Sequence, residues 1–457
     1  MAIVKQGYRP AANLNEIAAQ SSLEPLASGD PRYVEMGDGR GSRELRKMRS
    51  CLVSSDASQN RYAKVAFTGH RGCGKSTELL KLEHELVGNF YCLHLYVDES
   101  LICDCDYTDL LLWLTDALAQ RFAQDGLPLP SAVVDDVTDW FAEKTLEDAA
   151  TTKAEIVAEL QSEAQAKWGA FGTSLKLLAR IKARLQGNVE KRTVIRQTLQ
   201  NYSRDLLDRV NGLLDAAQNA LETAGRKPDL LIVQDNLDRL PVDVARRLFF
   251  DHGDLLKRLR AHVIFTVPIA MLMAPWDIGK VFDNRFTMPM VKVCNRDGTV
   301  HQAGVDALVR LIAARAELAA VFDAPDEVPA LLAEASGGSV RDLLRLLNDA
   351  QLEARTDSKP RIDAESAEAA IKNMRIDFER LLLPIEAYFP ILRRLHETKL
   401  SWQLPDKTLD ANTVKAEKEF FSQLLFNGTV LEYNGDCNWY DVHPIVQRIE
   451  AFRRGGG

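Results

Sequence analysis

The run GHRGCGKS, at residues 69–76, constrains the fold of this chain more than any other feature. It lies between an apolar run at 63–68 that predicts a buried strand and a pattern at 75–86 that predicts a helix. Glycines in such a run let successive backbone N–H groups converge on phosphate oxygens, and the helix N-terminus adds a favourable dipole. A chance glycine-rich turn does not need this setting of strand, loop and helix. The sequence therefore predicts a phosphate-binding loop.

The expected ligand of this loop is ATP with Mg²⁺. Lys75 should reach the β and γ phosphates, and the Ser76 hydroxyl should coordinate the metal. The residues predicted to contact the nucleotide are Gly69, His70, Arg71, Gly72, Cys73, Gly74, Lys75, Ser76 and Thr77.

A phosphate loop needs an acid for the metal, and Asp235 supplies one. It follows an apolar strand predicted at 229–234, which would direct its carboxylate towards Ser76; an ordinary turn residue is the alternative. The next residue is Asn236, whose amide can hold a water molecule but cannot take its proton. Either Asp238 substitutes as the base or turnover is slow, and Asp238 would equally serve as a helix N-cap. We expect an ATPase whose hydrolysis rate is in doubt.

Three further residues are candidates for contacts with the nucleotide. Thr266 ends the next predicted strand, where it would bond the γ-phosphate or the attacking water, or be a satisfied strand threonine. Arg341 opens a helix after a double-glycine turn and would reach the nucleotide from a helical domain. Arg285, in FDNRF, would reach the nucleotide of a neighbouring copy. For both arginines the alternative is a solvated surface charge.

Strands alternate with helices through much of the chain, which predicts an α/β fold with a parallel sheet. The last strand is expected at 288–294, and one helix at 242–260. A length of 457 residues suits several domains. We expect an N-terminal segment at 1–60 flanking the nucleotide site, a P-loop ATPase core at 61–298 with a helical insertion at about 131–225, a small helical lid at 299–376, and a winged-helix-like domain with a flexible tail at 377–457.

Composition argues against several other classes of protein. A net charge of -8 argues against general attraction to nucleic acid. The longest nearly apolar stretch, 261–276, is shorter than the roughly 18 residues of a membrane-spanning helix, and the N-terminus lacks the apolar core of a signal peptide. Seven scattered cysteines indicate reduced thiols, and Cys103 and Cys105 have no nearby ligands to complete a metal site. We predict a cytoplasmic protein without a membrane span.

Taken in order, these motifs resemble the AAA+ and STAND-like ATPases of the P-loop class, particularly the origin-recognition ATPases and the bacterial KAP-like and AAA defence ATPases. The resemblance covers residues 31–446. GHRGCGKST is similar to the Walker A element, LLIVQDNLDRL to Walker B, Thr266 to sensor 1 and GGSVRDLL to sensor 2. It implies that Arg43, in GRGSRELRKM, flanks the adenine, and that the setting is bacterial anti-phage defence. Asn236 departs from the acidic pattern of the family, which puts efficient hydrolysis in doubt.

The leading hypothesis is an ATP-driven switch that regulates or assembles with a partner, either as a homo-oligomer or with a protein effector. The alternative is an ATP-dependent nucleic-acid-binding initiator or transposition-type regulator. It would use the basic run at 176–196, although such runs are usually solvated, and the helix expected at 414–425 lacks a basic face. A small-molecule kinase is a third reading, which the additional helical and C-terminal domains disfavour. The basic run comprises Lys176, Arg180, Lys182, Arg184, Lys191, Arg192 and Arg196.

Overall fold

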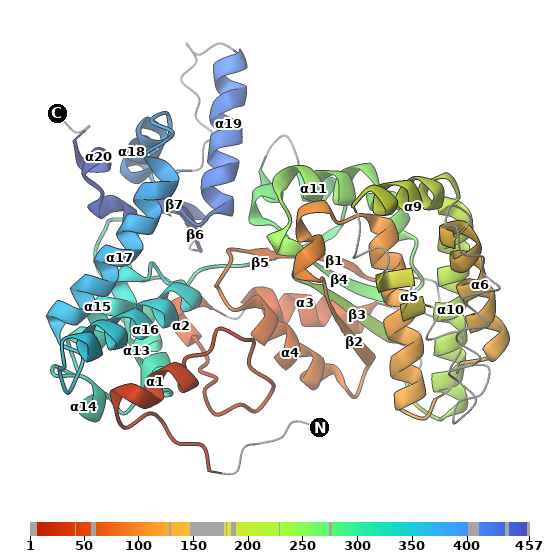
Figure 1. Ribbon diagram of the computed structural model, residues 1–457, viewed down its shortest axis with the longest axis horizontal. Coiled ribbons are helices and arrows are strands. Elements are labelled where there is room, and N and C mark those ends of the chain that lie inside the picture. The colour runs from red at the N-terminus through yellow and green to blue at the C-terminus, as the bar shows by residue number, and fades with distance from the viewer. Residues whose placement is uncertain are drawn as a thin grey trace.

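A five-stranded parallel sheet forms the centre of the computed structural model (Figure 1). The structure describes residues 7–454 except 42, 56–60, 128, 147–177, 180, 184–188, 228, 274–276, 401–410 and 435–437. The strand order is β2-β3-β4-β1-β5, which confirms the predicted α/β class. The strands are β1 (Lys64–Gly69), β2 (Tyr91–Tyr96), β3 (Leu230–Asp235), β4 (His262–Val267) and β5 (Asn284–Met288).

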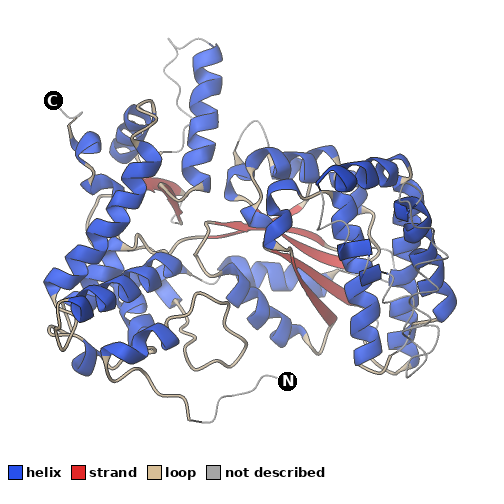
Figure 2. Ribbon diagram, in the orientation of Figure 1, coloured by secondary structure: helices blue, strands red, loops and turns tan. Residues whose placement is uncertain are grey.

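Helices cover both faces of the sheet, as Figure 2 shows. Every residue of β1, β3 and β4 is buried, which explains why these strands are continuous apolar runs instead of alternating ones. Val233 of β3 and Val65 of β1 both pair with Ile264 of β4. The carboxyl ends of the strands therefore meet at one edge, where Asp235 ends β3 and the phosphate loop follows β1.

The expected position of the last strand is wrong. Strand β5 begins at Asn284 and pairs with β1 from Val65↔Asn284 to Gly69↔Met288. Pro289 follows directly and has no N–H to donate, so the ladder ends there. The residues after it run as a connection to the helical domain.

On one face of the sheet lie α3 (Arg43–Ser54) and α4 (Lys75–Leu86), whose buried Met48 and Leu79 share a core with Phe67. The other face is covered by a larger core that includes α5 (Tyr107–Gln124), α11 (Val242–Arg246) and α12 (Gly253–Lys257). The single helix expected at 242–260 is wrong, because a π-helical turn at 247–251 interrupts it. The break lets Gly253 pack against Val281, where a Cβ would lie 2.5 Å from Cγ1.

The connection between β2 and β3 carries the helical insertion. Its described helices are α6 (Ser131–Leu146), α9 (Val189–Asn201) and α10 (Ser203–Thr223), which pack with α5 in the same core. The insertion lies beyond the β2 edge of the sheet, away from the helical domain (Figure 1).

Basic side chains of the run at 176–196 pair with acids of η2 (Glu99–Asp104) and α5, which precede the insertion. Arg192 and Arg196 are buried, 3.6 Å and 2.8 Å from Asp104, and Lys182 lies 3.2 Å from Asp116. These three side chains neutralise carboxylates and do not form an open phosphate-binding face. Lys176, Arg180 and Arg184 lie outside the described residues, and the side chain of Lys191 is not described.

A separate helical domain has its own apolar core, which the N-terminal helix α1 (Leu14–Gln20) joins through Leu14 and Ile17. The short helix α2 (Gly37–Arg40) packs on α13, the helix at Gln302–Ala313. The other helices of this domain are α13 (Gln302–Ala313), α14 (Leu318–Val321), α15 (Val328–Ala335), α16 (Val340–Thr356) and α17 (Ala364–Leu382).

The C-terminal part contains α18 (Tyr388–Thr398) and α19 (Ala411–Phe426), followed by the antiparallel strands β6 (Val430–Tyr433) and β7 (Trp439–Val442). Figure 1 shows these two strands between the helical domain and the sheet. None of the helices in the described part of the chain is both long and apolar enough to cross a membrane. The remaining elements are α20 (Glu450–Arg453) and the short 3-10 turns η2 (Glu99–Asp104), η3 (Leu237–Arg239), η5 (Ile269–Leu272), η6 (Ile278–Lys280) and η7 (Val446–Arg448).

Lys64, at the start of β1, is a buried charge at the opposite end of this strand from the phosphate loop. Its Nζ donates to the Ala261 carbonyl at 2.7 Å. Burial lowers the pKa of Lys64 to about 7 from the ordinary value of 10.5. Between these values the unfolded chain binds a proton that the folded chain does not, so this group makes stability rise with pH across that window.

We therefore expect Lys64→Met to raise the free energy of unfolding relative to the unsubstituted chain most strongly below pH 7. The difference should shrink by about 1 kcal/mol or more as the pH rises through the window, because one pKa unit corresponds to about 1.4 kcal/mol. Urea denaturation at a series of pH values measures it. Lys47→Met, at an exposed position, is the control and should show no such trend. A stability difference that is independent of pH would contradict the prediction.

Candidate functional site

The phosphate loop between β1 and α4 has a backbone that glycine alone adopts without strain. Gly72 has φ 83° and Gly74 has φ 98°. Gly74 is also the N-cap of α4, so the N–H groups of the first turn of this helix face the loop. Two glycines of the predicted motif thus occupy positions whose backbone requires them.

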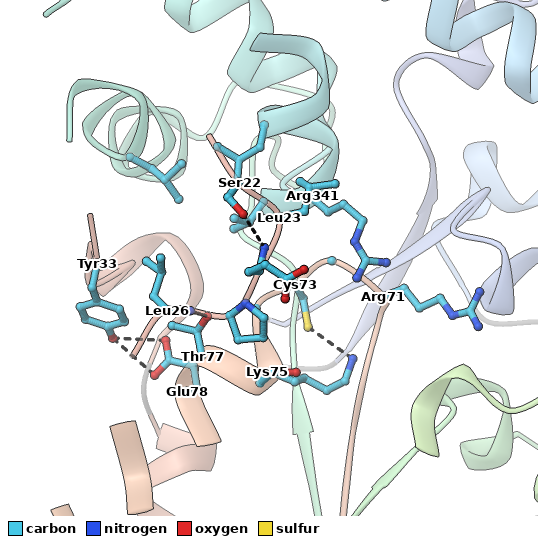
Figure 3. Close-up of a pocket in the computed structure, with 18 of the residues that line it drawn as sticks. Ser22, Leu23, Leu26, Tyr33, Arg71, Cys73, Lys75, Thr77, Glu78 and Arg341 are labelled. Carbon is cyan, nitrogen blue, oxygen red and sulfur yellow. Dashed lines mark hydrogen bonds between the residues drawn. The ribbon is translucent and has the colours of Figure 1, made fainter. Parts of the chain in front are cut away.

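The ammonium group of Lys75 is buried and has three oxygen partners. Its Nζ donates to the carbonyls of Gly69 and His70, each at 2.8 Å, and lies 2.8 Å from Asp238 Oδ2. Burial acts to lower the pKa of Lys75, but the Asp238 carboxylate outweighs it and the pKa is raised. Figure 3 shows the charged side chain running beside the loop towards Cys73.

Asp235 lies at the end of β3 beside the loop. Burial acts to raise the pKa of Asp235, but contacts with His94, Ser76 and the backbone of Asn236 outweigh it and lower the pKa. Its Oδ1 accepts from the Asn236 N–H at 2.7 Å, and its buried Oδ2 lies 3.4 Å from His94 Nε2. A buried, ionised carboxylate next to a serine hydroxyl fits Mg²⁺. Ser76 and Asp235 are the residues that would hold it.

His94 of β2 is a neighbour of this acid that the sequence reasoning missed. Its Nε2 lies 3.4 Å from Asp235 Oδ2, and its Nδ1 contacts Glu83 of α4. Burial acts to lower the pKa of His94, but hydrogen bonds to Asp235 and Glu83 raise it to about 9. In the sequence, His94 stands two residues before the end of a strand. It is in register with Val233 of β3, so its closeness to Asp235 could be predicted only with the knowledge that β2 and β3 are neighbours.

Asn236 and Asp238 both line the cavity above the loop. Asn236 has φ 67°, a left-handed conformation that asparagine tolerates better than most residues other than glycine. The turn that follows carries Asp238 to Lys75. The backbone therefore explains the asparagine, and the turn places the Asp238 carboxylate beside Lys75 of the phosphate loop.

The cavity has a volume of about 600 Å³, and three further parts of the chain line it besides the turn that follows β3. One wall is the loop with the start of α4, the second is the N-terminal segment at 22–36, and the third is the helical domain with Leu311, Arg315, Arg341 and Leu344. The segment at 22–36 is fixed to α4 by the Leu26 N–H, which donates to Thr77 Oγ1 at 3.2 Å.

Arg341 brings the helical domain against the loop. Its backbone N–H donates to the Gly72 carbonyl at 3.2 Å, and Figure 3 shows its side chain reaching from the helical domain towards the loop. Burial lowers the pKa of Arg71, and the charges of Arg239 and Arg341 act in the same direction although Asp238 opposes them. Arg71, Arg239 and Arg341 are all among the residues that line the cavity, and their positive charge favours a polyphosphate.

The opposite end of the cavity is lined by Tyr33, Glu78 and Arg40, which contact one another through Glu78. Tyr33 faces Glu78 in Figure 3, with its hydroxyl 3.2 Å from Glu78 Oε1. Buried Arg40 donates to Glu78 at 2.6 Å and to the Cys73 carbonyl at 2.7 Å. Arg43, the predicted base contact, is exposed at the start of α3 and is not among the residues that line the cavity, whereas Arg40 is. The close position of Arg40 depends on tertiary packing, so the sequence alone did not single it out.

Thr266 and Arg285 do not line the cavity. The Thr266 hydroxyl is buried, accepts from the Leu237 N–H at 3.0 Å and donates to the Gln234 carbonyl at 3.3 Å, so it supports the turn after β3. Arg285 is exposed on β5 and pairs with Asp277 at 2.8 Å. Their roles at this nucleotide or at that of a neighbouring copy stay predictions.

The phosphate loop after β1, the acid at the end of β3 and the helical domain over the loop are arranged around one cavity of an α/β fold, the fold class that the sequence predicted.

No protein-family model matches the sequence, and no curated protein matches it. Among solved structures, the Walker-type ATPase of Pyrococcus abyssi is similar over 95% of this chain and 99% of its own, with 12% identity and a TM-score of 0.42. The ORC2 protein of Aeropyrum pernix in its ADP form is similar over 95% of both chains, with 12% identity and a TM-score of 0.41. The RuvB Holliday junction branch migration motor of Thermotoga maritima covers 92% of this chain and 97% of its own, with 12% identity and a TM-score of 0.34.

The contact between the loop and the helical domain leaves no space for a side chain at Gly72. A Cβ there would lie 2.6 Å from the Cβ of Arg341 and 2.8 Å from Ser339 Oγ, and the backbone is left-handed. We expect Gly72→Ala to lower the free energy of unfolding by about 1–3 kcal/mol, through strain and displacement of α16. Thermal unfolding measures the effect. Gly88→Ala, where a Cβ meets nothing within 4 Å, is the matched control, and an equal effect of both substitutions would contradict the prediction.

Proposed function

We propose that this chain is an ATP-binding and slowly ATP-hydrolysing molecular switch that regulates or assembles with a protein partner. The observation that carries the proposal is the cavity walled by the phosphate loop on one side and by Arg341 of the helical domain on the other. A ligand that touches both walls favours one arrangement of the two parts over others. ATP and ADP would differ in the arrangement that they favour, because only ATP carries the γ-phosphate.

In the binding step, Lys75 would exchange Asp238 for phosphate oxygens while keeping its two loop carbonyls. The N–H groups of the loop and the start of α4 would bind the remaining phosphate oxygens. Ser76 and Asp235 would hold Mg²⁺, which supplies neutralisation of the phosphate charge. Arg341 would contact the terminal phosphate from the helical domain.

Hydrolysis requires that a water molecule attack the γ-phosphorus while the bond to the β–γ bridging oxygen breaks and the water loses a proton. Asn236 lines the cavity and would orient this water, but its amide cannot take the proton. We assign the proton to the carboxylate of Asp238, which becomes free once Lys75 has turned to the phosphates. Slow turnover is still expected, because Asn236 itself cannot act as the base.

The partner that we propose is a protein, either another copy of this chain or an effector. The alternative of nucleic acid relied on the basic run, of which Arg192 and Arg196 are buried and ion-paired. The proposed setting in bacterial anti-phage defence rests on the motif resemblance alone.

The first test of the proposal is an ATP titration of Lys75→Ala. We expect the affinity to fall by about 10- to 150-fold, because a hydrogen bond to a charged group contributes about 1.5–3 kcal/mol. Lys47→Ala, at an exposed position, is the control and should bind ATP normally. Calorimetry with the full chain gives the affinity, and sedimentation and limited proteolysis with an ATP analogue, ADP and no nucleotide examine the switch. Unchanged affinity in Lys75→Ala removes the assignment, and identical patterns in all three nucleotide conditions remove the switch.

The second test separates binding from hydrolysis. In Asp238→Asn the competing carboxylate and the proposed base disappear together, so we expect ATP to bind several-fold more tightly while turnover falls by about 10²–10⁴-fold. Calorimetry and phosphate release measure the two quantities. Asp243→Asn, exposed on α11, should leave both unchanged. Turnover that survives in Asp238→Asn would exclude Asp238 as the base.

A further inference from the structure

The turn from α19 into β6 lies directly against the phosphate loop, and His70 makes the central contact. His70 is a loop residue whose side chain is buried, with 1% of its surface exposed. Its Nε2 accepts the backbone N–H of Glu432 in β6 at 2.7 Å. Residues 70 and 432 are far apart in the sequence, so this bond joins the nucleotide site to the C-terminal part of the chain.

Burial and the direction of this hydrogen bond together fix the protonation state and the tautomer of the His70 imidazole. Burial and the charge of Lys75 lower the pKa of His70 to about 3, although a backbone contact with Leu425 acts in the other direction. The ring is therefore neutral, and because Nε2 accepts, the proton resides on Nδ1. The same residue uses its carbonyl to accept from Lys75 Nζ at 2.8 Å. The His70 side chain thus contacts strand β6, and its carbonyl contacts the Lys75 ammonium group that would bind phosphate.

Neighbouring contacts strengthen this junction between the nucleotide site and the C-terminal part of the chain. The guanidinium of Arg71 lies 4.4 Å from the centre of the Phe426 ring at the end of α19. Asn434 Nδ2 donates to the carbonyl of Arg40 at 2.6 Å, and the Tyr433 hydroxyl donates to the carbonyl of Gly337 in the helical domain at 2.8 Å.

Apolar packing completes the junction. Leu431, Tyr433 and Trp439 of the hairpin belong to the same core as Phe67 of β1 and Leu79 of α4. The hairpin therefore touches the loop, the sheet and the helical domain together, and its position depends on all three.

We infer that His70 is a positioning residue that couples docking of the β6–β7 hairpin to phosphate binding at the loop. This inference rests on the proposed function and specifies how the site is regulated. The docked hairpin holds the His70 carbonyl on Lys75, so the loop has the shape that phosphate binds. Coupling between two binding events is reciprocal, so nucleotide stabilises the docked hairpin by the same factor by which the docked hairpin tightens nucleotide binding.

The experiment compares ATP affinity with hydrogen exchange at the Glu432 amide in the full chain, using His70→Ala, His70→Gln and Tyr388→Phe. In the unsubstituted chain, a non-hydrolysable ATP analogue should slow this exchange by about 5-fold or more, the lower end of typical couplings. His70→Ala should bind ATP at least about 5-fold more weakly and lose the slowing. His70→Gln, which keeps an acceptor and a donor, should recover part of both. Tyr388→Phe removes a hydrogen bond to Gln423 within the C-terminal helices and should behave as the unsubstituted chain.

If His70→Ala keeps both the affinity and the ATP-dependent slowing, the inference is overturned. If His70→Ala does not fold, Phe426→Ala takes its place. This substitution leaves residues 69–76 unchanged and removes the ring that contacts Arg71. Unchanged ATP affinity in Phe426→Ala overturns the inference equally. Failure of the proposed function is distinguishable, since the unsubstituted chain would then bind no ATP.

Discussion

The buried ammonium group of Lys75 is the interaction on which the rest of the site depends. A positive charge inside a protein needs oxygen partners, and here two come from the loop itself and one from Asp238. The lysine therefore draws together β1, which precedes the loop, and the turn that follows β3. Remote parts of the sequence become one site because a single cation needs all of these oxygens.

The sequence predicted the parts of the fold that depend on local chemistry. The loop, its strand and its helix were found because glycine and apolar periodicity act over short distances, and Asp235 was found because it ends an apolar run. The position of β5 was not, since its end is set by pairing with β1 and by Pro289. Arg40 and His94 escaped notice for a related reason: their roles come from packing between segments that no local pattern connects.

The asparagine after Asp235 illustrates a constraint that sequence comparison with a motif cannot reveal. Its left-handed backbone bends the chain so that the turn after β3 brings Asp238 to the lysine. A longer acidic side chain at position 236 would have to adopt a conformation that asparagine tolerates more readily. The departure from the acidic pattern is thus tied to the course of the backbone as well as to the chemistry of the side chain.

The long insertion between β2 and β3 has a consequence for how the molecule is made. His94 and Asp235 lie side by side, yet the whole of residues 97–229 separates their strands. Closing such a loop carries an entropic cost that pairing of the strands must overcome, and contacts of this kind form late in folding. On the ribosome, the phosphate loop emerges long before the acid that completes it. The nascent chain therefore has a period in which one half of the site exists before the other, and in which the edge of β2 that pairs with β3 has no partner strand.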